Sequence, residues 1–457
     1  MKNMTLIEIA VACNGQLFGD GDYSVKEVLG VVVDSRKVEQ DYLFIATVGE
    51  RVDGHNFIDD VFNRGAMAVV CEKVPIHSKG PYILVENSFV ALGRIAKWYR
   101  MQLDIKVVGI TGSVGKTSTK EFISSVLARK YNVLKTEGNF NNEVGMPLTI
   151  LNIRSNHEVA VLEMGISNFG EMHRLSEIAK PDICVITNIG QCHLENLGSR
   201  HGILKAKTEI FDFMNEEGNV CINGDDDMLS TLKEIKGSNP IKFGMNADND
   251  IFATNVETHG LFGSTCDIHI KDIIFHTNIP LPGEHMVFNA LAATSVGSLL
   301  NMTSEEIAAG IETVQPVGGR SNIIRLEKWT IIDDCYNANP VSMKAALDLL
   351  GIADTYKIAI LGDMFELGTS EKALHKEVGS YAAAGNIDVL VCVGNLSVHM
   401  YDGAAETFKG KQTDLIYFKT REELTYALPT LVKENATILV KASHGMGFEN
   451  IVKALQK

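Results

Sequence analysis

One segment of the chain combines glycines, a lysine and hydroxyl side chains in the order of a phosphate-binding loop. It runs Thr111, Gly112, Ser113, Val114, Gly115, Lys116, Thr117, Ser118. The glycines let backbone NH groups converge on an anion, and the helix expected to follow adds partial positive charge. The Lys116 ammonium can neutralise phosphate, and the Thr117 hydroxyl can bind Mg²⁺.

The pattern G-x-x-x-x-G-K-[ST] is not fully met, because Ile110 stands at the first glycine position. The apolar run KVVGI before the loop and the helical KTSTKEFISSVLARK after it favour a phosphate site over a glycine-rich turn with a surface lysine. The loop alone leaves two interpretations open: an enzyme that uses ATP, or a nucleotide-dependent regulatory module.

Two more polar side chains follow apolar runs in the same region. Glu163 lies at the end of VAVLEMG, and His193 comes shortly after ICVITNIG. Ligands bind at the carboxyl edge of open α/β sheets, so both side chains are expected beside the loop. Each alone is more often structural, but together with the loop they indicate a site for a divalent metal and phosphate.

The segment HGILKAKTEIF places Lys205 and Lys207 on an expected helix. Lysines on a helix usually lie on its solvated face, and the residues alone favour that interpretation here.

Strands and helices must position these groups. Short apolar strands and helices alternate up to a helix near 88–102, and from Lys106 the pattern becomes strand–helix–strand, as in a parallel sheet covered by helices. Residues 250–280 alternate polar and apolar, which predicts appended antiparallel strands, and a helix near 288–300 is expected to close this part. After residue 319 a second strand–helix series begins. We expect an α/β protein with three domains, over residues 1–105, 106–314 and 315–457. A typical domain size of ~150 residues also suggests three domains for a chain of this length.

Composition limits the class of protein. The formal charge of −15 argues against general affinity for nucleic acid or anionic lipid, so a local site must hold any phosphate. The eight cysteines are scattered without a C-x-x-C pair, as small buried residues in a reducing compartment would be. No apolar stretch approaches the ~20 residues that span a bilayer. The cytoplasm is therefore the expected location, without a membrane partner.

These residues are part of a longer series of motifs that resembles the Mur ligases. The matching strings are DSR at 34–36, DGH at 53–55, TGSVGKTS at 111–118, GNFNNEVGMPLT at 138–149, EMG at 163–165, TNIGQCHLENLGS at 187–199, AKTEIF at 206–211, PGEHMVFNALAA at 282–293, GR at 319–320, IDDCYNANPVSM at 332–343 and GDMFELG at 362–368. GNFNNEVGMP and DDCYNANP are most similar to the members that add D-alanyl-D-alanine, and the D-N-P-R motif of the diaminopimelate-adding members is absent. Cys335 stands where the family usually has Ser, and His444 where Arg is usual.

The resemblance implies a UDP-sugar domain, a central P-loop ATPase domain and a C-terminal Rossmann-like domain. It also implies ATP and two Mg²⁺ ions as cofactors. Thr117 and Glu163 would bind one ion, and His193 would bind the other together with a carbamate formed on Lys207. Lys116, Glu163, His193 and Lys207 would then be the catalytic residues.

The resemblance also assigns nucleotide and substrate contacts. Besides the loop at 111–118, Asn289 would contact the adenine, Arg320 the phosphates and Asp334 the ribose. The side chains expected near the UDP-sugar are Ser35, Arg36, Asn139, Asn141 and Asn142.

The implied activity is ATP-dependent amide-bond formation in peptidoglycan precursor synthesis. The terminal carboxylate of a UDP-N-acetylmuramoyl tripeptide would become an acyl phosphate, which the amine of D-alanyl-D-alanine would attack. We expect a monomer. Another Mur-type ligase or a folylpolyglutamate-synthetase-like ligase shares this chemistry, but the latter lacks the UDP-sugar domain to which DSR and DGH belong. A nucleotide-dependent regulatory protein would bind nucleotide without making an amide.

Overall fold

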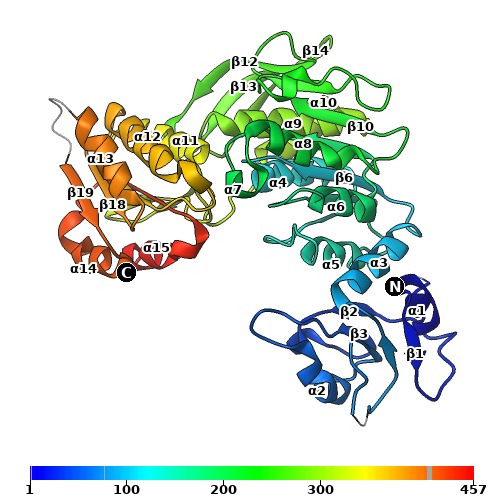
Figure 1. Cartoon of the computed structure of the whole chain (residues 1–457). Coiled ribbons are helices and arrows are strands. Elements are labelled where there is room, and N and C mark those ends of the chain that lie inside the picture. The colour runs from blue at the N-terminus through cyan, green and yellow to red at the C-terminus, as the bar shows by residue number, and fades with distance from the viewer. Residues whose placement is uncertain (2, 77, 409–413) are drawn as a thin grey trace.

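Apolar runs alternating with helices build three β-sheets, one after another, in the computed structural model, which describes residues 1, 3–76, 78–408 and 414–457. Figure 1 shows the N-terminal part in blue at the lower right, the central part above it and the C-terminal part in orange and red at the left. The expected three-part α/β architecture is therefore confirmed. The strands lie within residues 16–84, 106–279 and 322–441, and the boundaries near 105 and 315 stay a prediction.

The N-terminal sheet has the strand order β1-β5-β4-β3-β2, antiparallel at β1–β5 and parallel elsewhere. Its elements are α1 (Leu6–Cys13), β1 (Gln16–Phe18), β2 (Gly30–Val32), η1 (Ser35–Lys37), β3 (Tyr42–Ile45), η2 (Gly54–Phe57), α2 (Ile58–Asn63), β4 (Ala68–Cys71), β5 (Tyr82–Leu84) and α3 (Ser88–Arg100). The aspartates of the DSR and DGH strings, Asp34 and Asp53, cap the one-turn helices η1 and η2 by accepting backbone hydrogen bonds.

The central sheet has the order β14-β13-β12-β11-β10-β9-β6-β8-β7. Its strands are β6 (Lys106–Thr111), β7 (Val133–Lys135), β8 (Val159–Glu163), β9 (Ile183–Ile186), β10 (Asn219–Asn223), β11 (Ile241–Gly244), β12 (Ile251–Thr258), β13 (Ser264–Ile270) and β14 (Ile273–Ile279). Its helices are α4 (Lys116–Leu127), α5 (Gly145–Leu151), α6 (Glu171–Ala179), α7 (Leu194–Leu197), α8 (Arg200–Thr208), η3 (Glu209–Phe211), η4 (Leu229–Thr231), η5 (Gly260–Phe262), α9 (His285–Leu299) and α10 (Ser304–Glu312). The pairings β12–β13 and β13–β14 are antiparallel, as the alternation over 250–280 predicts.

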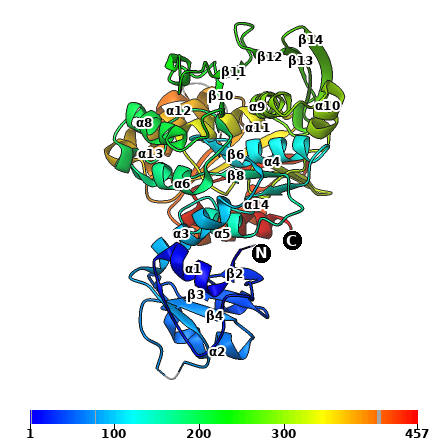
Figure 2. The same cartoon turned by 90° about the vertical axis from the view of Figure 1, so that its right-hand side faces the viewer.

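Two apolar layers cover this sheet. Helices α4, α9 and α10 pack on one face, and α5, α6 and α8 pack on the other. The second layer continues into the N-terminal part through α3, which lies at the junction in both views (Figures 1 and 2). There the Tyr99 hydroxyl donates to Ile153 O at 2.6 Å, and buried Arg100 donates to Ala179 O at 2.9 Å.

The C-terminal sheet has the order β15-β16-β20-β17-β18-β19, antiparallel only at β15–β16 among the described strands. Its elements are β15 (Asn322–Arg325), β16 (Trp329–Asp333), α11 (Pro340–Gly351), β17 (Tyr356–Gly362), η6 (Gly368–Ser370), α12 (Glu371–Ala384), β18 (Val389–Val393), α13 (Ser397–Thr407), β19 (Asp414–Phe418), α14 (Arg421–Leu431), β20 (Ala436–Lys441), η7 (His444–Met446) and α15 (Glu449–Leu455). Helices α11, α12 and α13 cover one face, and α14 and α15 cover the other.

Several elements depart from the sequence prediction. The helix near 288–300 is present as α9 but does not close the central part, because α10 follows and packs on α4 and β14. Strands β1, β11 and β15 were not predicted. Each has only three or four residues, too few for a period-two pattern to be evident, and each depends on pairing with a neighbouring strand.

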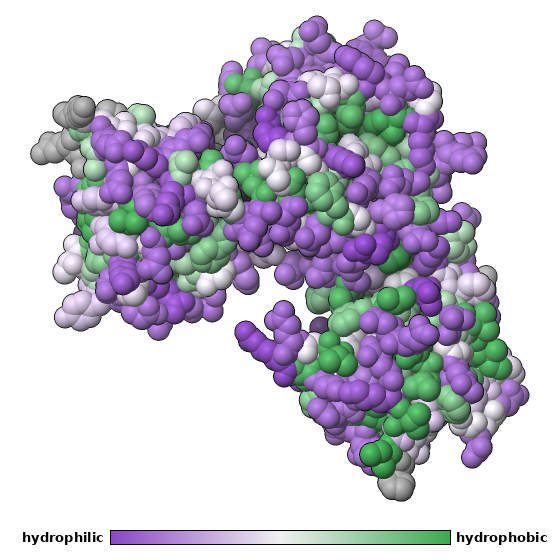
Figure 3. Space-filling view, in the orientation of Figure 1, coloured by the Kyte–Doolittle hydropathy of each residue, from purple (hydrophilic) through white to green (hydrophobic). Residues whose placement is uncertain are grey.

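One expectation from composition agrees with the structure. All eight cysteines lie within the described ranges, buried and free of disulfides. In the part of the chain that the structure describes, none of the helices combines the length and apolar character needed to cross a bilayer. On the face in Figure 3, hydrophilic residues cover most of the surface, and open space separates the C-terminal part from the N-terminal part.

Candidate active site

A cavity of about 820 Å³ lies where the carboxyl edge of the central sheet faces the C-terminal part. Many of the predicted site residues line it: Ser113, Val114, Gly115, Lys116, Ser118, Asn141, Asn142, Glu163, His193, Asn289, Arg320 and Asp334. The structure therefore brings residues from two sheets to one cleft. Its volume is within the range of small-molecule and cofactor sites.

The phosphate loop joins β6 to α4. Gly112 and Gly115 have φ of +152° and +85°, and a Cβ at Gly112 would lie 1.9 Å from Thr187 Oγ1, so this position requires glycine. The Lys116 ammonium folds back over the loop and donates to Gly112 O at 2.9 Å. Helix α4 begins at Lys116, so its unpaired first-turn NH groups and its positive dipole end lie at the cleft.

Glu163 ends β8 beside this loop and is buried. Its Oε2 accepts from the Thr117 hydroxyl at 2.9 Å, and its Oε1 accepts from Asn141 Nδ2 at 2.8 Å. The ammonium of buried Lys120, which sequence reasoning missed, lies 3.7 Å from Glu163 Oε2. The hydroxyl and the carboxylate are both oxygen donors, the ligands that Mg²⁺ prefers, so this pair fits a magnesium site.

His193 lies in the loop after β9 with φ of +52°. Its Nδ1 is 2.6 Å from Oε2 of Glu366, a residue of the C-terminal part. The contact with the His193 imidazole lowers the pKa of the Glu366 carboxyl. Within the described ranges, no group of three or more His, Cys, Asp or Glu side chains could hold a metal. The predicted metal residues therefore need additional oxygen ligands from phosphate, water or a modified side chain.

The expectation that Lys207 lies on the solvated face of its helix is wrong. Its side chain is 1% exposed, because α8 packs that face on the sheet, while Lys205 points to solvent. Burial, with a smaller contribution from the nearby Lys116 charge, lowers the pKa of Lys207 to about 8. Among the described residues, no carboxylate lies within ion-pair distance of its ammonium. A signal was present: Ile203, Ala206, Lys207 and Ile210 follow helical spacing and are all buried.

The C-terminal wall carries the predicted Arg320 and Asp334. The Arg320 guanidinium lies 4.0 Å from the centroid of the Tyr336 ring, which holds it at the cleft. Asp334 accepts from Ser321 N at 3.0 Å and from Lys441 Nζ at 2.6 Å. Sequence reasoning missed Lys441, although it ends the apolar strand β20 just as Glu163 ends β8.

Asn289 lies on α9, where its Oδ1 accepts from Thr119 Oγ1 of α4 at 2.8 Å. His285, one turn earlier on the same helix, also lines the cleft and was not predicted. Burial lowers the pKa of His285, so its imidazole is neutral near pH 7.

The residues predicted for the UDP-sugar divide into two groups. Asn141 and Asn142 line the cleft, whereas Ser35, Arg36 and Asn139 do not. Arg36 extends into solvent and pairs with Asp34 at 2.8 Å. The ammonium of its neighbour Lys37 lies 5.9 Å from the ring of Phe140, so η1 faces the 139–142 loop.

Neither departure from the family motifs lines the cleft. The buried Cys335 thiol donates to Asp333 Oδ1 at 2.9 Å, and burial raises the pKa of that thiol, so it stays a neutral donor as a serine hydroxyl would. The His444 ring lies 5.6 Å from the Tyr336 ring and contacts the residue that holds Arg320.

Fold and site together define a nucleotide-binding α/β protein whose P-loop cleft is completed by a second parallel sheet. The chain matches the Mur ligase family catalytic domain over residues 27–97, the Mur ligase middle domain over 110–297 and the Mur ligase glutamate ligase domain over 319–444. The chain belongs to the Mur ligase family.

Similar proteins resemble the chain over its full length. The UDP-N-acetylmuramoyl-tripeptide–D-alanyl-D-alanine ligase of Bacillus subtilis (strain 168) is 39% identical over 100% of this chain and 99% of the relative. A crystal structure of MurF from Acinetobacter baumannii has a TM-score of 0.91 at 32% identity, covering 99% of each chain. A structure of MurF ligase from Thermotoga maritima in complex with ADP has a TM-score of 0.81 at 30% identity, covering 93% of this chain and 97% of that one.

Proposed function

We propose that this chain joins the terminal carboxylate of a UDP-N-acetylmuramoyl tripeptide to the amine of D-alanyl-D-alanine, using ATP. The relatives that match its whole length carry the name of that ligase. The observation that carries the proposal is the convergence of Lys116, the Thr117–Glu163 pair and Arg320 on one cleft. The proposed reaction is a step of peptidoglycan precursor synthesis in the cytoplasm.

The residues act on ATP from both sides. Lys116 and the α4 N-terminus bind its outer phosphates, and Arg320 approaches them from the opposite wall. Asn289 holds the adenine, and Asp334, fixed by Lys441, holds the ribose. Since these groups belong to two parts of the chain, bound ATP draws the walls together and excludes water. Water exclusion protects the acyl phosphate from hydrolysis.

Phosphorylation turns a poor electrophile into an acyl phosphate with a good leaving group. The tripeptide carboxylate attacks the γ-phosphorus and releases ADP, and the D-alanyl-D-alanine amine then attacks the carbonyl carbon and releases phosphate. Positioning and charge neutralisation by the protein supply most of the catalysis. Asn141, Asn142 and the facing η1 segment hold the UDP-sugar so that its peptide reaches the phosphoryl group.

Magnesium, when bound, neutralises charge on the transferring phosphoryl group. Thr117 and Glu163 would hold one ion. His193, released from Glu366, would hold a second together with a carbamate on Lys207. A carbamate is an anionic oxygen ligand, whereas an ammonium cannot bind a metal.

The direct test is incubation of the chain with ATP, the UDP-sugar tripeptide and D-alanyl-D-alanine, followed by mass spectrometry. We expect a UDP-sugar pentapeptide together with ADP and phosphate. A product only with a single amino acid in place of the dipeptide would favour another Mur-type ligase, and a product with folate and glutamate would favour the folylpolyglutamate-type reaction. Nucleotide binding without an amide product would favour a regulatory module. Gel filtration with light scattering tests the monomer that we also propose.

Removal of the metal site should stop ligation. We expect chelation of Mg²⁺ to abolish the activity, and Glu163→Gln to lower kcat by about 100-fold, because an anionic oxygen ligand is replaced by a neutral amide. The measurement is steady-state phosphate release at saturating substrates over a Mg²⁺ titration.

Glu121→Gln is the matched control. Glu121 lies 3.3 Å from the ammonium of the same Lys120 that approaches Glu163. We expect this variant to keep kcat within about threefold, since it changes the pairing of Lys120 but removes no proposed metal ligand. Equal losses in both variants would assign the effect to Lys120 and contradict the metal role of Glu163.

A further inference from the structure

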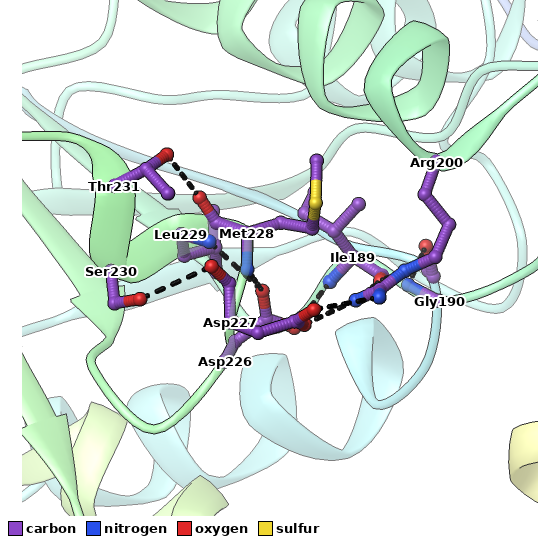
Figure 4. A network of polar contacts seen from close by, with 10 residues as sticks. Ile189, Gly190, Arg200, Asp226, Asp227, Met228, Leu229, Ser230 and Thr231 are labelled. Carbon is purple, nitrogen blue, oxygen red and sulfur yellow. Dashed lines mark hydrogen bonds and ion pairs between the residues drawn. The ribbon is translucent and has the colours of Figure 1, made fainter.

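A network of polar contacts holds the backbone of Ile189 from both sides (Figure 4). The Ile189 NH donates to Asp226 Oδ2 at 2.8 Å, and the Ile189 carbonyl accepts from Arg200 Nε at 3.0 Å and from Nη2 at 2.9 Å. Arg200 is in turn fixed by the Asp227 carboxylate, with Nη1 donating to Oδ2 at 2.8 Å. One peptide segment is therefore clamped between an acid and an arginine that come from different elements.

The clamped segment also holds the phosphate loop. Asn188 Oδ1 accepts from Val114 N at 3.0 Å, and its Nδ2 donates to Val114 O at 3.0 Å. Gly190 N donates to Ser113 Oγ at 2.9 Å. A displacement of Ile189 would therefore also displace the phosphate loop, which is followed directly by Lys116.

Two other functional groups are connected through the chain to the residues of this network. Three residues beyond Gly190 the chain reaches His193. Arg200 is the first residue of α8, and Lys207 lies on that helix two turns later. The clamp thus joins the phosphate loop, the His193 loop and the helix that bears Lys207.

The other end of the clamp is itself anchored. Asp226 Oδ1 accepts from Met228 N at 3.0 Å and from Leu229 N at 2.9 Å, at the start of η4. With both carboxylate oxygens in use, Asp226 ties η4 to Ile189. None of the three side chains that form this clamp, Arg200, Asp226 and Asp227, lines the main cleft.

We propose that Arg200, Asp226 and Asp227 are positioning residues, which fix Ile189 so that the phosphate loop, His193 and Lys207 keep their relative places. This inference rests on the proposed function for its effect on catalysis. The Arg200–Asp227 pair is exposed enough to add little to overall stability. Small displacements of catalytic groups are costly to the rate, however, and a 1 Å shift can cost about 10²-fold.

The test uses Arg200→Ala and Asp226→Ala in the full chain, with Asp226→Asn as the conservative variant. Asparagine keeps an acceptor oxygen of the same shape but loses the charge. Arg64→Ala is the matched control, because Arg64 forms an exposed pair with Asp60 in the N-terminal part, at 3.3 Å. The readouts are kcat and KM for ATP, thermal unfolding, and hydrogen exchange of the peptide that covers residues 187–193.

We expect Arg200→Ala and Asp226→Ala to lower kcat by about tenfold or more, with KM for ATP changed by less than about threefold. Exchange over 187–193 should accelerate in both, Asp226→Asn should recover part of both losses, and Arg64→Ala should match the unchanged chain. Wild-type kcat and exchange in both alanine variants would overturn the proposal. So would a loss of kcat that only follows the loss of folded protein.

The exchange measurement separates this proposal from the proposed function. If the unchanged chain makes no amide product, the function fails. In that case hydrogen exchange by itself decides the proposal. Faster exchange over 187–193 in the two alanine variants would still support the clamp, and unchanged exchange would overturn it.

Discussion

Replacing Lys116 with alanine is expected to lower kcat for ligation by about 10³-fold, because the phosphoryl group then transfers without its nearest fixed cation. The ammonium lies directly over the phosphate loop, where it donates to Gly112 O. Among the described residues, this is the one hydrogen bond that the ammonium makes, so the free energy of unfolding should change by less than about 1 kcal/mol. Rapid-quench measurement of ADP formation, with thermal unfolding in parallel, gives both quantities.

Lys106→Ala is the control for this variant. Lys106 begins the same strand, β6, at the opposite edge of the sheet, and pairs with Asp182 at 3.4 Å. We expect it to ligate at the normal rate. A Lys116→Ala enzyme that forms product normally would show that the phosphates bind elsewhere and would refute the site assignment.

The second large effect concerns Lys207. Lys207→Ala is expected to lower the rate of ligation by about 10²–10³-fold, because the site then loses the anionic oxygens of the proposed carbamate. The residue is buried without a carboxylate partner among the described side chains, so its deletion leaves a small cavity in the core, where the carbamate is proposed to form. Formate or acetate should enter that cavity and restore part of the activity. Lys205→Ala, on the exposed face of α8, should leave activity unchanged.

The pKa of Lys207 adds a pH dependence. Carbon dioxide reacts only with the neutral amine, and burial lowers the pKa of this lysine to about 8 from 10.5. At pH 8 about half of the amine is neutral, against well under 1% for a lysine with the ordinary pKa. Enzyme depleted of CO₂ should therefore be activated by dissolved CO₂ with an effect that grows from pH 7 to pH 9. Activity independent of CO₂, with full activity of Lys207→Ala, would exclude the carbamate.

The protonation of Lys207 also affects stability. Its folded pKa lies below the unfolded value, so between about pH 8 and 10.5 the unfolded chain binds more protons. Stability lost to the buried charge at low pH is therefore recovered as pH rises through this window, in CO₂-free buffer. Lys207→Met should remove this slope in denaturant unfolding curves.

Much of the fold could be read from local patterns. Most strands of the three sheets and the loop between β6 and α4 follow from apolar runs, periodicity and glycine positions, which are properties of neighbouring residues. Glu163 was found because a charged residue at the end of a buried strand reaches the carboxyl edge. The same rule identifies Lys441 in retrospect. Strands β1, β11 and β15 were not predicted, because strands of three or four residues are defined by their partner strands.

The burial of Lys207 could not be predicted from its neighbours in the sequence alone. Whether a helical lysine meets solvent or a sheet depends on which face of α8 packs inward, and the central sheet decides that. Glu366 illustrates the same limit, because its contact with His193 joins residues of two different parts of the chain.

The sequence by itself determined the class of fold, the phosphate loop and the strand-end acid, since backbone conformation and burial pattern are encoded within a few residues. Only the tertiary structure decided that Arg320, Asp334 and Lys441 face Lys116 across one cleft and that Ile189 is clamped beside it. These contacts join residues far apart in the chain, and the packing of whole sheets and helices sets their distances.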